Sequence, residues 1–197
     1  GRQWIPIGNI SNPFSGIYDG NGKVINNLYY NNPANEYVGL FGYILGATIT
    51  NVAIASGCLF GYQETSGICG AAYSSSTISY CANNATVYGK MEQNGGVCGY
   101  LENSTVTDCI NYGLVSGFNF SGGVVGRCKK NANNKIIRCI NVGQVFGMRV
   151  TTGNLIGYND DLGATIKTCF YDNQINASSG VTSSKTATEG DTDRPGR

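Results

Sequence analysis

The chain has 197 residues and a formal net charge of +1, and charged side chains occupy only 13% of positions. A charge this close to zero gives no general attraction to nucleic acid or to an anionic membrane, and no apolar run is long enough to cross a bilayer. Histidine is absent, which removes the commonest general base and the commonest metal ligand. We therefore expect no cofactor, no metal site and no membrane insertion.

Residues 1–36 fit the repeat that follows them poorly. They contain Trp4, which is the only tryptophan, and a turn at Asp19-Gly-Asn-Gly22. The end of a repetitive β-structure has to hide an open hydrophobic face and open strand edges. We predict that this segment forms an N-terminal cap or an irregular first coil.

Residues 37–173 hold five copies of a unit of about 29 residues, which is defined by three markers. The first marker is Gly-x-x-Gly, at Gly39–Gly42, Gly67–Gly70, Gly96–Gly99, Gly123–Gly126 and, as a variant, Gly153–Gly157. The second is a β-rich run that ends at Val52, Cys81, Cys109, Cys139 and Cys169. The third is an apolar-x-Gly run that ends at Gly61, Gly89, Gly117 and Gly147. Three markers that keep one phase indicate a true internal repeat.

Each unit contains three short β segments separated by turn residues, and none shows the apolar period of a helix. Such a unit cannot bury its apolar side alone, whereas stacked units can, and stacking also pairs equivalent strands. A β-propeller is the competing architecture, but its blades need four strands and about 40–50 residues. We predict an all-β fold: a right-handed parallel β-helix with three strands per coil and glycine columns at its corners.

Residues 174–197 are rich in Ser, Thr and Gly and nearly devoid of large apolar residues. This composition predicts a tail or linker. The last full coil is then left without a cap in the sequence. Self-assembly into a filament or surface layer, with the coil ends of different copies stacking, is therefore one functional alternative.

The repeat resembles the GLUG-motif repeats of bacterial proteins. Gly39-Leu-Phe-Gly42 followed by Thr48-Ile-Thr-Asn-Val52 is similar to that motif, and the later Gly-Gly-Val-x-Gly units are similar to its variants. Phe14-x-Gly-x-x-Asp-Gly-Asn-Gly-x-x-Ile25 resembles the segment that often precedes such repeats. The resemblance implies a secreted or cell-surface β-solenoid of the adhesin type. It assigns no catalytic residue.

Cysteine is frequent, with eight residues in the chain. Four of them share the repeat position of Val52, and two others, Cys69 and Cys98, share the position of Phe41. Cysteine thus alternates with plain hydrophobic residues, as a small core residue does. Parallel stacked side chains also disfavour disulfide geometry, so we predict mostly free, buried thiols.

Two columns of aromatic residues are the candidate binding face. In an apolar-x-Gly strand the middle residue points outward when the apolar residue points inward. The candidate residues are Phe60, Tyr88 and Phe146 in one column, with Ser116 between the last two, and Tyr43, Tyr100 and Tyr158 in another, with Ala71 and Arg127. An exposed aromatic patch suggests contact with a sugar or a protein.

Glu64 and Glu92 are the sharpest catalytic candidates, because each follows a third-marker Gly by three residues. On adjacent coils they would lie about 5 Å apart, near the spacing of a retaining glycosidase pair. Their turn-like neighbours instead favour a solvated loop without an apolar pocket. A different polar column, Asn83, Asn111 and Asn141, is expected to form a structural turn ladder.

The sequence therefore favours a non-catalytic extracellular or cell-surface β-solenoid that acts as an adhesin-like or structural binding module. Its partner would be a surface polysaccharide, a protein or other copies of the chain. The alternatives are the self-assembling subunit and a polysaccharide-degrading β-helix enzyme that uses Glu64 and Glu92.

Overall fold

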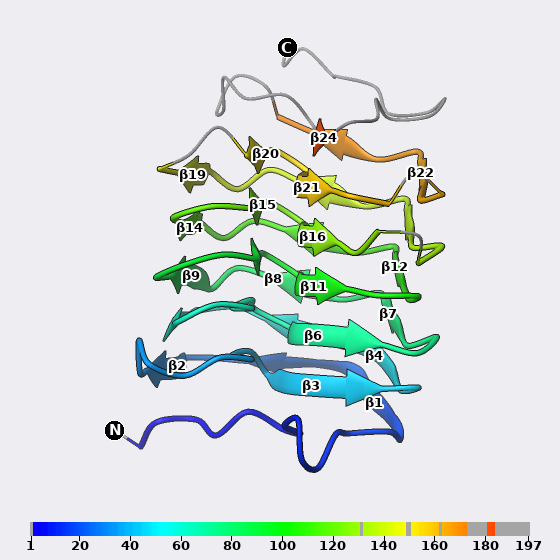
Figure 1. Ribbon diagram of the computed structural model, residues 1–197. Helices are drawn as coiled ribbons and strands as arrows, with labels where there is room; N and C mark the ends of the chain where they lie inside the picture. Colours follow the sequence, from blue (N-terminus) through cyan, green and yellow to red (C-terminus); the bar gives the residue numbers. More distant parts are fainter. Residues whose placement is uncertain (1, 131, 149–150, 162, 173–180, 184–197) are drawn as a thin grey trace.

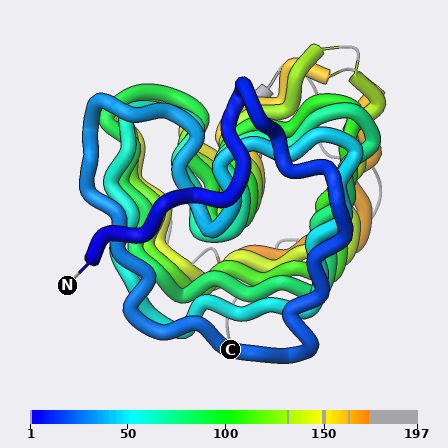
Figure 2. The backbone as a smooth tube through the Cα atoms, turned by 90° about the horizontal axis from the view of Figure 1, so that it is seen from below, coloured from blue at the N-terminus to red at the C-terminus, as the bar shows by residue number. Residues whose placement is uncertain are grey.

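The computed structural model describes residues 2–130, 132–148, 151–161, 163–172 and 181–183. These residues form parallel strands stacked as a solenoid of about five turns with about 29 residues per coil, and they contain no helix (Figure 1). Seen along its axis from the N-terminal end, the chain runs clockwise as it recedes, which is a right-handed coil (Figure 2). The predicted fold class, a right-handed parallel β-helix, is confirmed.

Three large sheets and one short ladder run along the axis. Sheet A consists of β3 (Phe41–Leu45), β6 (Cys69–Tyr73), β11 (Cys98–Leu101), β16 (Val125–Cys128), β21 (Ile156–Asn159) and β24 (Val181–Ser183). Sheet C consists of β2 (Leu28–Asn31), β5 (Gly57–Gly61), β9 (Thr86–Gly89), β14 (Val115–Gly117) and β19 (Val145–Gly147). The inner ladder consists of β10 (Asn94–Gly95), β15 (Ser121–Gly122) and β20 (Thr152–Gly153).

Sheet B is the largest. It consists of β1 (Ile17–Ile25), β4 (Thr48–Ile54), β7 (Thr77–Ser79), β8 (Ala82–Asn83), β12 (Thr105–Thr107), β13 (Ile110–Asn111), β17 (Lys135–Ile137), β18 (Ile140–Asn141), β22 (Thr165–Lys167) and β23 (Phe170–Tyr171).

The sequence predicts three strands per coil, but the coil from β6 to β10 has five. Its sheet B strand is divided in two, and the inner ladder adds another strand. In the four coils after β4, a left-handed residue such as Asp108, with φ 54°, lies between the two sheet B strands, because the chain turns there and the ladder is interrupted; β4 itself continues through the left-handed Asn51.

Equivalent residues of the repeat face one another across every ladder. Cys98 pairs with Cys69 on one side and with Val125 on the other, for example. The columns read from the repeat are therefore the columns of the structure, in sheet A as in sheet C. A core of stacked apolar side chains follows directly from this register.

The segment between sheet C and sheet A turns inward across each coil (Figure 2). Its glycines lie where backbones meet. A Cβ at Gly96 would collide with the Asn111 side chain and the Gly123 carbonyl, and a Cβ at Gly99 would lie 2.6 Å from the Gly70 oxygen and 2.7 Å from the Gln93 oxygen. The prediction that glycines mark corners holds for the first glycine of the marker, since Gly96 lies at the bend between the inner ladder and sheet A, but Gly99 lies within a strand. Gly96 lets this bend approach the Asn111 side chain, and Gly99 lets its strand pack closely on the backbones of Gly70 and Gln93.

Asn83, Asn111 and Asn141 form the predicted ladder and are fully buried. The Nδ2 of Asn83 donates to Oδ1 of Asn111 at 2.8 Å, and Nδ2 of Asn111 donates to Oδ1 of Asn141 at 2.8 Å. Each side chain also bonds the backbone two residues on, as Asn111 does to Gly113. The ladder thereby satisfies buried amides along the axis and fixes the surface on which the inward turn rests.

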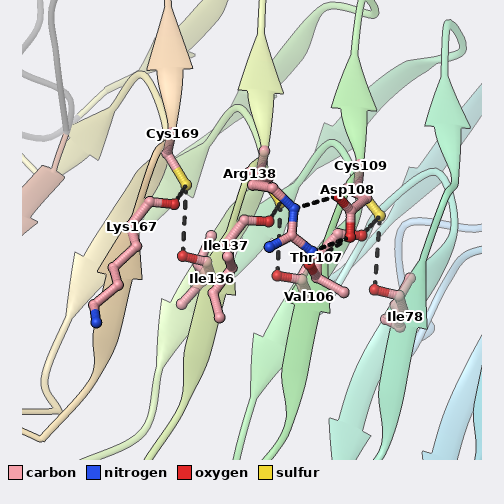
Figure 3. Close-up of polar contacts among 11 residues, drawn as sticks. Ile78, Val106, Thr107, Asp108, Cys109, Ile136, Ile137, Arg138, Lys167 and Cys169 are labelled. Atoms are coloured by element: carbon pink, nitrogen blue, oxygen red, sulfur yellow. Dashed lines mark hydrogen bonds and ion pairs between the residues drawn. The ribbon is translucent and has the colours of Figure 1, made fainter. Parts of the chain in front are cut away.

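All eight cysteines are free and seven are buried, which confirms that prediction. The thiol of Cys109 donates to the Thr107 carbonyl at 3.1 Å and lies 3.7 Å from the Ile78 carbonyl (Figure 3). Cys169 repeats the pattern two coils on, toward Lys167 and Ile136 (Figure 3). These thiols therefore act as small core residues that also bond the coil below.

The two ends differ from the central coils. Residues 7–31 already pair in parallel with the next coil, through bridges at Ile7 and Phe14 and through β1 and β2. At the other end, β24 lies within the segment predicted as a tail and pairs with β21. An open sheet edge offers free backbone groups that such a strand can pair with. The remainder of 174–197 lies outside the described residues.

None of the described segments forms a helix with the length and apolarity that crossing a bilayer would require.

Candidate binding site

The first aromatic column lies on the outer side of sheet C. Phe60 pairs with Tyr88, Tyr88 with Ser116, and Ser116 with Phe146, as the repeat predicts. The Phe60 and Tyr88 rings meet edge to face with centroids 6.4 Å apart. Tyr88 is 41% exposed and Phe146 is 54% exposed, since their partners in the strand, Val87 and Val145, take the inward positions.

A groove of about 600 Å³ runs over this column. Its lining residues are Tyr29, Tyr30, Asn31, Cys58, Phe60, Tyr88, Gly89, Lys90, Ser116, Gly117, Phe118 and Met148. They come from successive coils, so the groove follows the solenoid axis rather than a single strand. Phe146 is exposed but is not among the lining residues.

The groove walls are mostly aromatic or aliphatic, with a few polar groups. Asn31, Ser116 and the tyrosine hydroxyls can exchange hydrogen bonds with a ligand, and Lys90 is the one charged residue among those that line it. Burial raises the pKa of the half-buried Cys58 thiol, so this group stays neutral. The groove therefore offers flat apolar contacts with sparse hydrogen bonds and no carboxylate, which suits an uncharged ligand.

The second aromatic column lies on sheet A and is packed rather than open. Tyr43, Ala71, Tyr100, Arg127 and Tyr158 occupy one register position, as predicted. Their side chains are half-buried, apart from the fully buried Ala71.

Tyr73 fills the gap that Ala71 leaves in this column. Its ring stacks on Tyr43 with centroids 4.6 Å apart and tilts against Tyr100 at 5.6 Å. Tyr37 meets Tyr43 edge to face at 5.3 Å. We call Tyr37, Tyr43, Tyr73 and Tyr100 the tyrosine ladder.

Arg127 continues this surface toward the C-terminal end. Its guanidinium carbon lies 5.3 Å from the Phe120 ring centroid and 5.9 Å from that of Tyr158. Nη2 pairs with Asp160 at 3.3 Å. The chain thus holds one of its own guanidinium groups between two rings and a carboxylate.

Glu64 does not align with Glu92. Val38 pairs with Thr65, Ser66 with Gly95, and the backbone N–H of Glu64 donates to the Glu92 carbonyl, so the counterpart of Glu64 is Gln93. One additional residue between Gly89 and the inner ladder causes the offset. The predicted shared column of Glu64 and Glu92 is therefore wrong.

The environment of Glu64 is also unlike the expected solvated loop. Glu64 is only 6% exposed, and burial, followed by the carboxylate of Glu36, raises its pKa to about 7. Its Oε2 is buried without a hydrogen-bond partner among the described residues. Glu92 is half-buried and accepts a hydrogen bond from Asn119 at 3.3 Å.

Sequence reasoning missed several residues of both surfaces. Tyr29 and Cys58 share a register position next to the predicted column, and Tyr73 lies two residues beyond its own column member, Ala71. The register could have indicated Tyr29 and Cys58, because they are paired residues of a repeat strand. The position of Tyr73 depends on a ring reaching across to Tyr43, which the register does not specify.

Metal binding finds no support in the described part of the chain, where no three Cys, Asp or Glu side chains gather in a way that could hold an ion.

No protein-family model matches the chain, and no curated protein or solved structure is similar to it at a significant level.

Proposed function

We propose that this chain is a non-catalytic extracellular β-solenoid, and that the groove on sheet C binds a surface polysaccharide. The observation that carries the proposal is the groove itself: three rings, from Tyr29, Phe60 and Tyr88, on the outer face of adjacent coils. The location outside the cell is supported by the resemblance of the repeat to surface-protein repeats.

The shape and chemistry of the groove favour a polymeric sugar over a compact ligand. The groove lies open along the axis, and a chain of sugar rings can contact one coil after another at the strand spacing of about 4.8 Å. Aromatic rings pack against the apolar faces of sugars, while hydroxyl and amide groups bond their edges. With Lys90 as its one charged lining residue, the groove fits an uncharged glycan.

The test is isothermal titration calorimetry against a panel of neutral polysaccharides and oligosaccharides. Tyr88→Ala and Phe60→Ala should each weaken the binding of a glycan that the wild type binds by about tenfold or more, because each removes one stacking surface. Tyr112→Ala removes a 52% exposed ring that lies between β13 and β14 and does not line the groove, so it should change the affinity less than about twofold.

Protection of Cys58 from alkylation provides an independent readout, since this thiol lines the groove. Bound glycan should slow its modification. If no glycan in the panel binds, or if Tyr88→Ala and Phe60→Ala leave the affinity unchanged, the assignment of the groove is refuted.

Self-assembly is the second candidate, favoured by the N-terminal coil. Ile5, Ile10 and Ile17 are 82%, 64% and 80% exposed, and β2 is the edge strand of sheet C. Sedimentation velocity over a wide concentration range tests it. Concentration-dependent polymers that Ile17→Lys dissolves would support self-assembly, and a monomer at every concentration would refute it.

A further inference from the structure

The ring column of the sheet C groove has one gap. Phe60, Tyr88 and Phe146 occupy a single outward register position, and Ser116 occupies the same position between Tyr88 and Phe146. Adjacent strands lie about 4.8 Å apart, so a serine between two rings leaves a depression about one coil wide. We call this depression the Ser116 gap.

The Ser116 gap opens into the groove. On sheet A the corresponding break in the ring column, at Ala71, is filled by Tyr73, and Ala71 is fully buried. Ser116, in contrast, is only half-buried and lines the groove together with Gly117. A group on a bound ligand can therefore reach the Ser116 side chain.

The surroundings of the gap combine apolar side chains with one hydroxyl group. Phe118 follows two residues on, and the backbone N–H of Met148 donates to the Gly117 carbonyl at 3.2 Å, so both apolar side chains line the groove beside Ser116. The Ser116 hydroxyl can donate and accept hydrogen bonds. The gap thus suits a short substituent that has an apolar end and a hydrogen-bonding group.

Charge narrows the choice of substituent. Among the described residues that line the groove, none is acidic, so an ammonium group would find no carboxylate there. Lys90 is the one charged lining residue, and its Nζ lies 5.9 Å from the ring centroid of Tyr62, which is not a lining residue. An uncharged substituent therefore fits the gap better than a carboxylate or an ammonium does.

We propose that the Ser116 gap is a subsite for the N-acetyl group of an acetylated amino-sugar polymer. The proposal rests on the assignment of the groove to glycan binding, and it names the class of glycan. The Ser116 hydroxyl donates to the acetyl carbonyl, and the acetyl methyl packs against Phe118 and Met148. The sugar rings stack on the aromatic rings of the neighbouring coils.

Ser116 is then the residue that determines specificity in the groove. An aromatic residue at this position would continue the column from Tyr88 to Phe146 and fill the gap. The stacking surface for the sugar rings would remain, but the acetyl group would have no space. Discrimination by exclusion of a substituent predicts that affinity for acetylated and plain glycans can be changed separately.

The experiment is isothermal titration calorimetry of the full chain with three oligomers of equal length, made of N-acetylglucosamine, of glucose and of a uronic acid. The N-acetylglucosamine oligomer should bind about tenfold more tightly than the glucose oligomer, because it adds a hydrogen bond and a buried methyl group. The uronic acid oligomer should bind no more tightly than the glucose oligomer.

Two substitutions at Ser116 separate space from hydrogen bonding. Ser116→Tyr should lower the affinity for the N-acetylglucosamine oligomer about tenfold and leave that for the glucose oligomer within about threefold. Ser116→Ala keeps the gap and should weaken only the acetylated oligomer, by about fivefold. Thr86→Ala is the matched control, because it removes a hydroxyl from a sheet C strand outside the groove lining, and it should change both affinities less than about twofold.

The outcomes distinguish the subsite from the groove. Equal affinity of the wild type for the two neutral oligomers, a preference for the uronic acid oligomer, or an equal loss for both neutral oligomers in folded Ser116→Tyr would overturn the subsite and leave the groove a glycan site. Tyr88→Ala should weaken both neutral oligomers, since it removes a stacking ring. If none of the oligomers binds the wild type, the assignment of the groove fails, and the subsite fails with it.

Discussion

The buried carboxyl of Glu64 predicts how the stability of the solenoid changes with pH. Folding raises the pKa of this group from an ordinary 4.5 to about 7, through burial first and the neighbouring Glu36 second. The folded state therefore holds a proton that the unfolded chain has already released between these two values. Stability from this group is fully present below pH 4.5, declines between pH 4.5 and 7, and is lost above 7.

The size of the effect follows from the two pKa values. A rise from 4.5 to about 7 corresponds to a cost of about 3 kcal/mol for keeping the ionised carboxyl buried at pH 8. Glu64→Gln keeps the shape and removes the charge. The variant should be more stable than the wild type by about 2–3 kcal/mol at pH 8 and nearly equal to it at pH 4.5.

Urea denaturation of both proteins at several pH values, followed by circular dichroism, measures this difference. Every other titrating group is common to the two chains, so its contribution cancels in the comparison. A variant that is destabilised, or whose stability relative to wild type is the same at pH 4.5 and 8, would show that the carboxyl is not buried in ionised form as described. Glu92→Gln, at the half-buried neighbour, is the matched control for the loss of a carboxyl group.

Further predictions concern the framework. Gly96→Ala should destabilise the chain by about 3 kcal/mol or more in urea denaturation, because its Cβ would meet the Asn111 side chain. Gly163→Ala should cost under about 1 kcal/mol, because its Cβ would lie 3.3 Å from the nearest atom, Oδ1 of Asn133. Asn111→Ala should cost about 2–4 kcal/mol by orphaning its ladder partners, whereas the exposed Asn84→Ala should cost about 0.5 kcal/mol, and equal losses would refute the ladder argument. In native protein a thiol reagent should modify Cys58 alone, and rapid modification of several thiols would contradict the burial of the others.

The sequence predicts the ladder columns well because the fold repeats. Once the three markers define the phase, pairing equivalent residues is the only way to bury every apolar side, and Cys98 must then lie between Cys69 and Val125. The Asn111 column and the buried thiols follow from the same argument. The residues that form each column can therefore be predicted from a single sequence.

The path of the chain between the columns was less predictable. The repeat predicts glycine columns at corners, and Gly96 does lie at a bend, but this bend is inside the coil against Asn111. A glycine column indicates close approach but does not say which backbone approaches. The misplacement of Glu64 has a similar origin: a single extra residue after Gly89 shifts the alignment by one, and a marker spacing that varies by several residues cannot reveal it.

A comparison of the outward columns of sheets B and C shows why the aromatic residues of sheet C call for an explanation beyond the fold. On sheet B one outward position begins with the exposed Ile17 in the first coil and is polar from the next coil on, as Thr48, Thr77, Thr105, Lys135 and Thr165. Polar residues thus satisfy an outward strand position of this solenoid, as they do in most half-exposed strands. The rings of Phe60 and Tyr88 occupy an equally outward position on sheet C, and they leave apolar surface in water that the fold does not require. Those rings are the physical basis for the proposal that the groove on sheet C binds a ligand.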